Sequence, residues 1–263
     1  MKNFIVLFIC LILILSVAEK ASAYEADRIN ITILYDNYLF SEGTKTDWGF
    51  SCIIEGTEKT ILFDTGTKSD ILFHNMNFLK KEPKDVELVA ISHNHGDHTG
   101  GLYSFLDKNN RVSVYLPISF PGTFVNRVKE KKAKVISVDK PVEICKDVFL
   151  TGEMGRQIKE QSMILDTSKG LVVLTGCAHP GIVSIVKRAK EILDKKIYLV
   201  LGGFHLMRKS EAEVKDIIKD FRKLGVSKVG ATHCTGDRAI ELFKEAYGKN
   251  FIRLGVGKVI EIL

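Results

Sequence analysis

Cysteine is scarce in this sequence, with five residues among 263. Cys10 lies in the first apolar run and follows Ile9 rather than a small residue, which argues against a lipoprotein attachment site. The other four cysteines are widely spaced, at Cys52, Cys145, Cys177 and Cys234. A chain of this length can bury a hydrophobic core without disulfide staples. We therefore expect no dense disulfide framework.

A strong excess of charge of one sign is also missing. The formal net charge is +6, and hydrophobic and charged residues make up 45% and 27% of the chain. These values are ordinary for globular proteins and disfavour the disordered, collagen-like and coiled-coil classes. The densest basic run, KEKKAK at residues 129–134, is typical of a solvated face. We expect a small-molecule substrate and no nucleic-acid partner. The sequence does not decide whether the protein is a monomer or an oligomer.

Long hydrophobic runs are limited to one, at residues 4–18. A basic start precedes it and the small residues Ala21-Ser22-Ala23 follow it, which is typical of a secretory signal peptide. We predict that residues 1–23 are a signal peptide and that the protein is exported, to the periplasm or beyond the cell. An uncleaved membrane anchor is the alternative, although the run is shorter than the ~20 apolar residues that span a bilayer. No later stretch is apolar enough, so we expect no stable membrane span after signal removal.

The rest of the chain, residues 24–263, is predicted to form a single α/β domain. Short β-rich runs come first, and the C-terminal part alternates strands with helices, which favours layered sheets with helices on their outer faces. We expect strands at residues 31–35, 49–54, 60–63, 86–91, 171–174, 197–201, 229–231 and 258–263. We expect helices at residues 69–79, 124–132, 181–193, 211–224 and 238–246.

Three histidines lie within six residues directly after the apolar strand expected at residues 86–91. The run is His93-Asn94-His95-Gly96-Asp97-His98. Histidine is the commonest metal-ligating side chain, and Gly96 permits a sharp turn. His93 and His95 can then face one cation while Asp97 and His98 face a second, at the ~3.5 to 4 Å separation of two-metal sites. The run therefore predicts a metal centre.

This histidine run resembles the signature of the metallo-β-lactamase-fold hydrolases, His-x-His-x-Asp-His after a buried strand. The segments TGCAHPG, GGFHL and THCTG at residues 175–181, 202–206 and 232–236 further resemble a branch related to archaeal dihydropterin ribofuranosylaminobenzene phosphate synthase. The resemblance implies a four-layer αββα sandwich with the metals at one edge of the two sheets. It also implies that Asp64, in the run ILFDTG, supports the metal loop from behind. The run Asp64-Thr65-Gly66 could also suggest an aspartic protease. That mechanism needs two such carboxylates, from a second copy of the motif or a partner chain, so we disfavour it.

Two divalent metal ions are implied by the same resemblance, with zinc expected and iron or manganese as alternatives. His93, His95 and His179 would hold the first ion, and Asp97, His98 and His233 the second. Cys177 stands near the position of an aspartate that bridges both metals in many members. It is either a thiolate ligand or a small buried residue. Glu153 and Cys234 are weaker candidates, and His74 is expected to lie in packing or at the surface.

Hydrolysis of a phosphoester, lactone or thioester is the expected activity, because two cations make hydroxide available from water at neutral pH. Asp97 is the candidate that orients the nucleophile, and His205, after a Gly-Gly pair, could steady the developing oxyanion. A pterin-related synthase that forms a carbon–nitrogen bond is the alternative enzyme. A non-catalytic metal-binding protein is a third possibility. RNA processing is a further function that the fold supports. The sequence lacks the long basic clamp that we would expect of an RNA-processing enzyme.

Overall fold

A computed structural model describes residues 28–263 of the protein. The predicted signal peptide, residues 1–23, lies outside the described residues, and its cleavage stays a prediction. Among residues 28–263, no helix is both long and apolar enough to cross a bilayer. The four cysteines of this part of the chain are all free thiols, as expected from their spacing.

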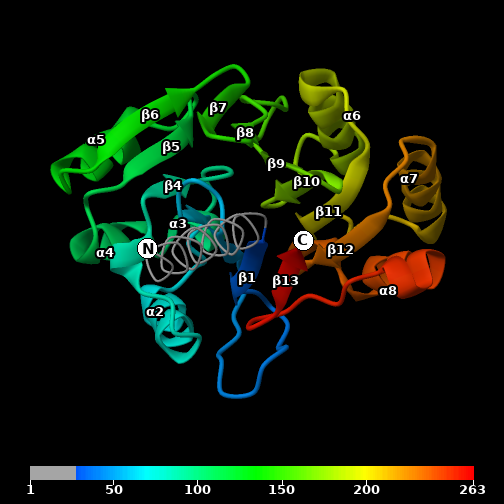
Figure 1. Ribbon diagram of the computed structural model, residues 1–263, viewed down its shortest axis with the longest axis horizontal. Coiled ribbons are helices and arrows are strands. Elements are labelled where there is room, and N and C mark those ends of the chain that lie inside the picture. The colour runs from blue at the N-terminus through cyan, green and yellow to red at the C-terminus, as the bar shows by residue number, and fades with distance from the viewer. Residues whose placement is uncertain (1–27) are drawn as a thin grey trace, which may run out of the picture.

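The N-terminal half and the last strand form one sheet of seven strands (Figure 1). Its order is β13 (Val259–Ile262), β1 (Ile29–Tyr35), β2 (Ser51–Glu55), β3 (Ile61–Phe63), β4 (Leu88–Ala90), β5 (Ser113–Pro117) and β6 (Lys134–Val138). Strands β3 to β6 run parallel, whereas β13, β1, β2 and β3 pair antiparallel. The carboxyl ends of β1, β3 and β4 consequently share one edge of this sheet.

A second sheet of six strands comes from the C-terminal half. Its order is β12 (Lys228–Thr232), β11 (Ile197–Gly203), β10 (Gly170–Thr175), β9 (Met163–Thr167), β8 (Val148–Leu150) and β7 (Val142–Cys145). Strands β10, β11 and β12 run parallel, and β9 pairs antiparallel with β10. The carboxyl ends of β10 to β12 therefore share an edge with the amino end of β9.

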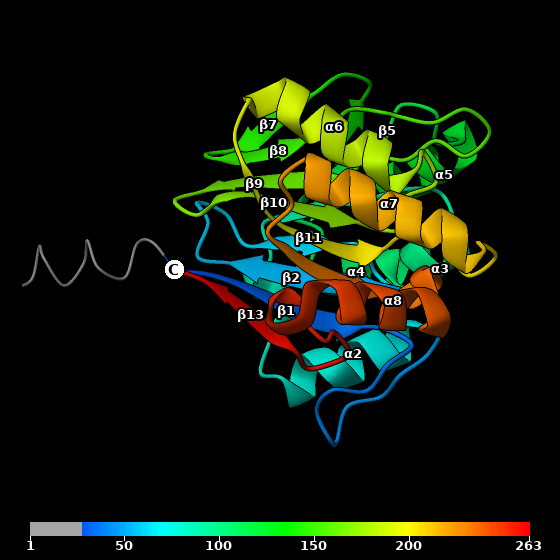
Figure 2. The same cartoon turned by 90° about the vertical axis from the view of Figure 1, so that its right-hand side faces the viewer.

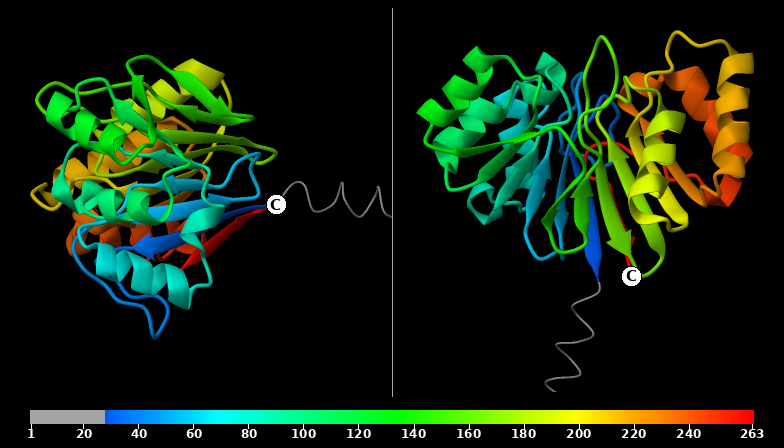
Figure 3. Two further views of the ribbon diagram at one scale, coloured as in Figure 1. Left: turned by 90° about the vertical axis from the view of Figure 1, so that its left-hand side faces the viewer. Right: turned by 90° about the horizontal axis from the view of Figure 1, so that it is seen from above.

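Helices cover the outer face of each sheet. Helices α2 (Ser69–Phe78), α4 (Leu102–Lys108) and α5 (Gly122–Glu130) flank the seven-stranded sheet, and α6 (Ile182–Leu193), α7 (Glu211–Lys223) and α8 (Asp237–Tyr247) flank the six-stranded one (Figures 1 and 2). Seen from above, the two sheets lie face to face between these helix layers (Figure 3). Short helical turns complete the chain: η1 (Pro83–Asp85), α3 (Gly96–Thr99), η2 (His233–Thr235) and η3 (Gly248–Asn250).

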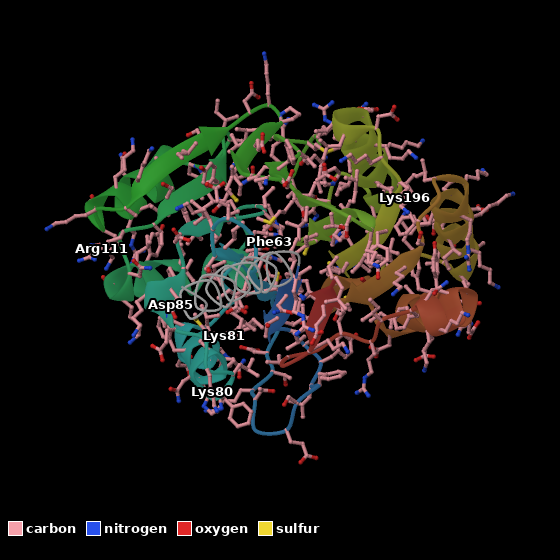
Figure 4. The ribbon with its side chains drawn as sticks, viewed as in Figure 1. Phe63, Lys80, Lys81, Asp85, Arg111 and Lys196 are labelled. Carbon is pink, nitrogen blue, oxygen red and sulfur yellow. The ribbon has the colours of Figure 1, made fainter. Side chains whose placement is uncertain are left out.

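Apolar side chains fill all three interlayer spaces. The central cluster lies between the sheets and includes Ile31, Phe63, Met163 and Leu174, all 0% exposed. Figure 4 shows Phe63 near the middle of the molecule, with Arg111 toward its periphery. Two further clusters lie under the helix layers. Burial of each large side chain stabilises the fold by about 1.5 to 3 kcal/mol. The predicted αββα sandwich is confirmed.

Helix positions follow the local sequence closely. Helix α6 buries Ile182, Ile185, Val186 and Ala189, the spacing of one helical face. Helix α5 begins and ends two residues before the predicted range 124–132. Its end is set by Lys132, which has a left-handed φ of 67° that cannot continue a right-handed helix.

Candidate metal centre

Six strand ends deliver polar loops to one edge of the sandwich. In the first sheet these loops follow β1, β3 and β4, and in the second sheet they follow β10, β11 and β12. Because the carboxyl ends of parallel strands meet at one sheet edge, side chains far apart in the sequence come together there. The histidines on these loops are His93, His95, His98, His179, His205 and His233.

His93, His95 and His179 form a first donor group, whose ligand atoms all lie within 4.8 Å of one another. The Nε2 atom of His93 is 3.0 Å from Nδ1 of His95. The His179 ring comes from the second sheet and its centroid lies 4.9 Å from that of His95. The buried Nε2 atom of His179 has no hydrogen-bond partner among the described residues. An orphaned buried nitrogen beside two other imidazoles fits a metal ligand.

Asp97, His98, Cys177 and His233 form a second donor group with the same 4.8 Å spread. Asp97 Oδ2 lies 3.5 Å from His98 Nε2 and 3.3 Å from His233 Nε2. Cys177 Sγ lies 3.2 Å from His98 Nε2. The His233 Nε2 atom is buried and makes no hydrogen bond of good geometry within residues 28–263. Four converging donors of mixed nitrogen, oxygen and sulfur type fit a tetrahedral cation such as zinc.

Asp64 lies behind the second group and fixes His98. Its Oδ1 accepts the backbone N–H of Ser92 at 2.7 Å. Its Oδ2 is 2.7 Å from both Ser92 Oγ and His98 Nδ1. Because this carboxylate binds Nδ1 of His98, Nε2 of His98 faces Asp97 and Cys177. Histidine ligands of metals are commonly oriented by a carboxylate in this way.

Comparisons with known proteins show the family of this chain. Residues 49–176 match the sequence model of the family described as the metallo-beta-lactamase superfamily. The 7,8-dihydropterin-6-methyl-4-(beta-D-ribofuranosyl)-aminobenzene-5'-phosphate synthase of Methanocaldococcus jannaschii is 32% identical, over 90% of this chain and 98% of the synthase. The chain belongs to the metallo-beta-lactamase superfamily.

Solved structures of superfamily members share this architecture. Tm1679, described as a metal-dependent hydrolase of the beta-lactamase superfamily, is 31% identical with a TM-score of 0.75, over 89% of this chain and 99% of its own. The metallo-beta-lactamase fold protein YhfI of Bacillus subtilis is 14% identical with a TM-score of 0.65, over 89% and 99% of the two chains. The second likeness shows the fold alone. The predicted family membership is confirmed.

Electrostatics differ between the two donor groups of this superfamily member. Burial and the neighbouring histidines hold the pKa of His93 well below its usual range, and burial with His205 and His95 lowers the pKa of His179 to about 4. Neutral imidazoles at pH 7 are the form that binds a cation. Burial lowers the pKa of His98, but the Asp64 and Asp97 carboxylates outweigh burial and raise it to about 10. The two carboxylates thus favour positive charge at the second group, as they would favour a bound cation.

Glu160 was missed by the sequence prediction, although it organises the loop after β10. It is 0% exposed and lies three residues before the start of β9 at Met163. Its Oε1 accepts the backbone N–H groups of Cys177 and Ala178 at 3.0 and 2.9 Å, and its Oε2 accepts that of His179 at 2.8 Å. Burial raises the pKa of this carboxyl to about 7 despite these bonds. Its only sequence signal is an acidic residue in a polar run before a strand.

The loop after β1 supports His233 and was also missed. Asn37 Oδ1 lies 2.9 Å from His233 Nδ1, and the Asp36 carboxylate accepts the hydroxyl of Thr232 at 2.6 Å. The Trp48 ring, 44% exposed, lies 4.8 Å from the His233 ring. These residues stand almost two hundred positions from His233 in the chain, so no local pattern links them.

Unfavourable backbone conformations gather at the centre. Asp64, Ala178, His205 and His233 all have a positive φ, between 51° and 60°. Such conformations of non-glycine residues persist only where surrounding contacts hold them, and they concentrate at functional sites. Gly176 permits the loops to meet, because a Cβ atom there would lie 2.1 Å from Ser92 Oγ and 2.9 Å from Asp64 Oδ2.

The other sequence candidates lie at or outside the edge of the centre. His205 is exposed, and its ring centroid is 4.4 Å from that of His179. Cys234 is 4% exposed and lies near Cys177. Glu153 belongs to none of the donor groups formed by residues 28–263, and its carboxylate accepts the backbone N–H of Ser119. His74 lies on α2, where its Nε2 is 2.9 Å from the carbonyl oxygen of Gly43.

Proposed function

We propose that this protein is a metal-dependent hydrolase of an ester-type bond: a phosphoester, a lactone or a thioester. The observation that carries the proposal is the pair of donor groups at one sheet edge, with His93 centred 4.3 Å from His98. Each group contains one buried imidazole nitrogen without a hydrogen-bond partner among the described residues: Nε2 of His179 in the first group and Nε2 of His233 in the second. We propose zinc as the metal, with iron or manganese as alternatives, because imidazole, carboxylate and thiol donors suit borderline cations.

The two cations, when bound, would supply hydroxide from water near neutral pH and neutralise charge on the attacked group. The chain's own residues would position the reactants. Asp97 Oδ2 lies 3.5 Å from His98 Nε2 and 3.3 Å from His233 Nε2, and these two imidazoles outweigh burial and hold the pKa of this carboxyl well below its usual range. We assign its other oxygen, Oδ1, to the attacking water. His205 is exposed beside His179 and would donate a hydrogen bond to the developing oxyanion.

A pocket of about 260 Å³ next to His179 and His205 supports a substrate with an apolar part. Apolar side chains, among them Ile182, Phe204 and Ile217, line most of it. Lys209 also lines the pocket, and its Nζ donates to Glu213 Oε1 at 2.7 Å. Such a pocket next to the reacting bond would hold the acyl chain or the leaving group away from water.

Metal analysis of the purified protein followed by a screen of phosphodiesters, lactones and thioesters tests this proposal. Asp97→Ala and His95→Ala should each lower kcat/KM by at least about 100-fold, because each removes a donor of one cation. His74→Ala is the matched control and should retain activity, since His74 lies on α2 outside both groups. Full activity in Asp97→Ala would refute the assignment. A protein that binds no metal and hydrolyses nothing after loading with zinc, manganese or iron would instead be non-catalytic.

A second candidate is a synthase that joins a pterin to an arylamine ribofuranosyl phosphate through a carbon–nitrogen bond. The likeness to the Methanocaldococcus jannaschii synthase, 32% identical over 90% of this chain, favours it. The predicted export argues against it, because pterin cofactors are made inside cells. Incubation of the metal-loaded protein with a reduced pterin and the arylamine separates the two candidates. A coupled product would favour the synthase, whereas hydrolysed esters without coupling would favour the hydrolase.

We further propose that the protein works outside the cytoplasm after removal of residues 1–23. The basic start, the apolar run and the small residues before Ala23 support this. N-terminal sequencing of the mature protein from cell fractions is the test. A mature chain that begins at Tyr24 in the exported fraction supports the proposal, and one that retains Met1 in the cytosol refutes it.

A further inference from the structure

A third donor group lies beside the two-cation centre. It consists of Cys177, His205 and Cys234, whose ligand atoms lie within 4.8 Å of one another. The three residues follow three neighbouring parallel strands, β10, β11 and β12. In the ladder, Thr175 pairs with Gly202 and Gly202 pairs with Ala231. Two or three residues beyond these partners, each strand delivers one member of the group, so the sheet itself sets their proximity.

The backbone around this group is closely fitted. A Cβ atom on Gly203 would lie 2.7 Å from Cys234 Sγ and 2.4 Å from the carbonyl oxygen of Gly176. His205 has a φ of 55°, and the next residue, Leu206, donates its N–H to the carbonyl oxygen of Cys234 at 3.2 Å. The loops after β11 and β12 are thereby held together. Gly203, which has no Cβ, and His205, with its left-handed φ, together allow the imidazole of His205 to lie close to the two thiols.

Burial and exposure divide the group into an inner and an outer side. Cys177 and Cys234 are 3% and 4% exposed, whereas His205 is exposed. Cys234 Sγ lies 3.6 Å from the carbonyl oxygen of Cys177, a weak partner for a buried thiol. Two inner sulfur donors and one outer imidazole match the donor set of three-ligand zinc sites, in which the fourth position stays open. The exposed side of His205 would leave that position accessible to solvent.

We propose that Cys177, His205 and Cys234 form a third, sulfur-rich cation site beside the two-cation centre, with Zn²⁺ as its preferred occupant. Thiolate donors select zinc and other soft or borderline cations over magnesium, calcium and manganese. Cys177 belongs to the second and the third donor groups, so occupancy of the two would be coupled through its sulfur. The site would share Cys177 and His205 with the proposed hydrolase centre, but its occupancy by metal can be measured without any hydrolase activity.

Cobalt and zinc titrations of the reduced full-length protein test the site. Co²⁺ should produce a thiolate-to-cobalt charge-transfer band, and Cys234→Ser should lower its intensity about twofold, because one of two bound thiolates is lost. Wild-type protein should bind one more equivalent of Zn²⁺ than Cys234→Ser. Cys145→Ser is the matched control and should leave both measurements unchanged, since Cys145 lies in β7 outside the donor groups. The same band and the same zinc count in Cys234→Ser and wild type would overturn the proposal.

Two further measurements test the site even if Cys234→Ser does not fold. Zn²⁺ should protect Cys234 of the wild-type protein from alkylation at least about tenfold, measured on peptides by mass spectrometry, while Cys145 reacts equally with and without zinc. His205→Ala should weaken Zn²⁺ binding at the third site at least about tenfold, since changes even to residues behind a ligand cost this much. Equal alkylation of Cys234 in the presence and absence of zinc would contradict the site. These readouts are independent of any substrate.

Discussion

At the scale of single residues, one carboxylate defines the loop that joins the two donor groups. Glu160 accepts three consecutive backbone N–H groups, at residues 177 to 179. The first and the last of these residues are candidate ligands of different cations. A buried acceptor shared by three donors leaves the loop little freedom, and its loss leaves buried N–H groups unpaired.

Glu160→Gln should therefore destabilise the protein by about 1 to 3 kcal/mol, because an amide NH₂ replaces one acceptor oxygen and faces a backbone donor. Urea unfolding at neutral pH measures this change, and zinc affinity should fall in parallel. Glu153→Gln is the control, since Glu153 accepts a single exposed N–H, that of Ser119. Equal midpoints for the two variants would contradict the role given to Glu160.

Asp36 makes the stability of the metal-free protein depend on pH. Burial raises the pKa of its carboxyl from 3.8 to about 6. The folded state therefore binds this proton more tightly than the unfolded state. The resulting stabilisation is full below pH ~4 and is lost as the pH rises through ~6, by about 3 kcal/mol for a shift of this size.

Asp36→Asn removes this titration, so its unfolding free energy should fall less steeply between pH ~4 and ~6 than that of the wild type. Urea unfolding over a pH series measures the difference. Asp85→Asn, at an exposed carboxyl, serves as the control and should follow the wild type. Parallel curves for Asp36→Asn and wild type would show that Asp36 does not titrate in this way.

The residues that could be predicted from sequence are those in local runs. His93, His95, Asp97 and His98 stand together after one strand, and their spacing alone indicates a metal centre. Glu160, Asp36 and Trp48 could not be predicted, because their contacts join segments far apart in the chain. The grouping of His205 with Cys234 was missed for the same reason: it depends on the pairing of β11 with β12.

At the scale of elements, α7 has the most complete local start signal. Ser210 accepts the N–H of Glu213, and the Glu213 carboxylate accepts the N–H of Ser210. This reciprocal cap satisfies two donors that a helix start leaves unpaired. The helix predicted at residues 211–224 is therefore found at Glu211–Lys223. Helix α4 was not predicted, because its seven residues carry only one short apolar face.

Ser210→Ala should destabilise the protein by about 1 kcal/mol, the usual contribution of a cap. Thermal unfolding of the metal-loaded protein measures it, with Ser227→Ala, an exposed residue in the turn before β12, as the control. Metal content should be unchanged in both variants, because α7 lies on the outer face of its sheet. A loss of metal in Ser210→Ala would mean that α7 supports the centre more directly than its position indicates.

At the scale of the whole molecule, the donors come from both sheets. His93, His95, Asp97 and His98 follow the first sheet, and Cys177, His179 and His233 follow the second. Bound cations would thus connect the two halves of the sandwich at one edge. The layered fold itself was predictable from the alternation of strands and helices, whereas the pairing of β13 with β1 needs contacts across the whole chain.

Removal of metal by a chelator should accordingly lower the thermal midpoint, because ligands that bind only the folded state stabilise it by about 2.7 kcal/mol at a hundredfold excess over Kd. Calorimetry with and without added Zn²⁺ measures the effect. A variant that lacks donors from both sheets, His95→Ala with His233→Ala, should respond less to the chelator than the wild type, because only the third donor group, whose members all follow the second sheet, stays complete. An unchanged midpoint for the wild type would contradict the bridging role.

The pairing of Ile29 with Ile262 has a practical consequence for the bench. Strand β1 begins and β13 ends side by side, and the centre follows the opposite end of β1 (Figure 2). A bead or sensor surface coupled through either of these strand ends would hold every molecule with its histidine-lined edge turned outward. Immobilised protein should therefore keep its full capacity for metal and for dissolved ligands.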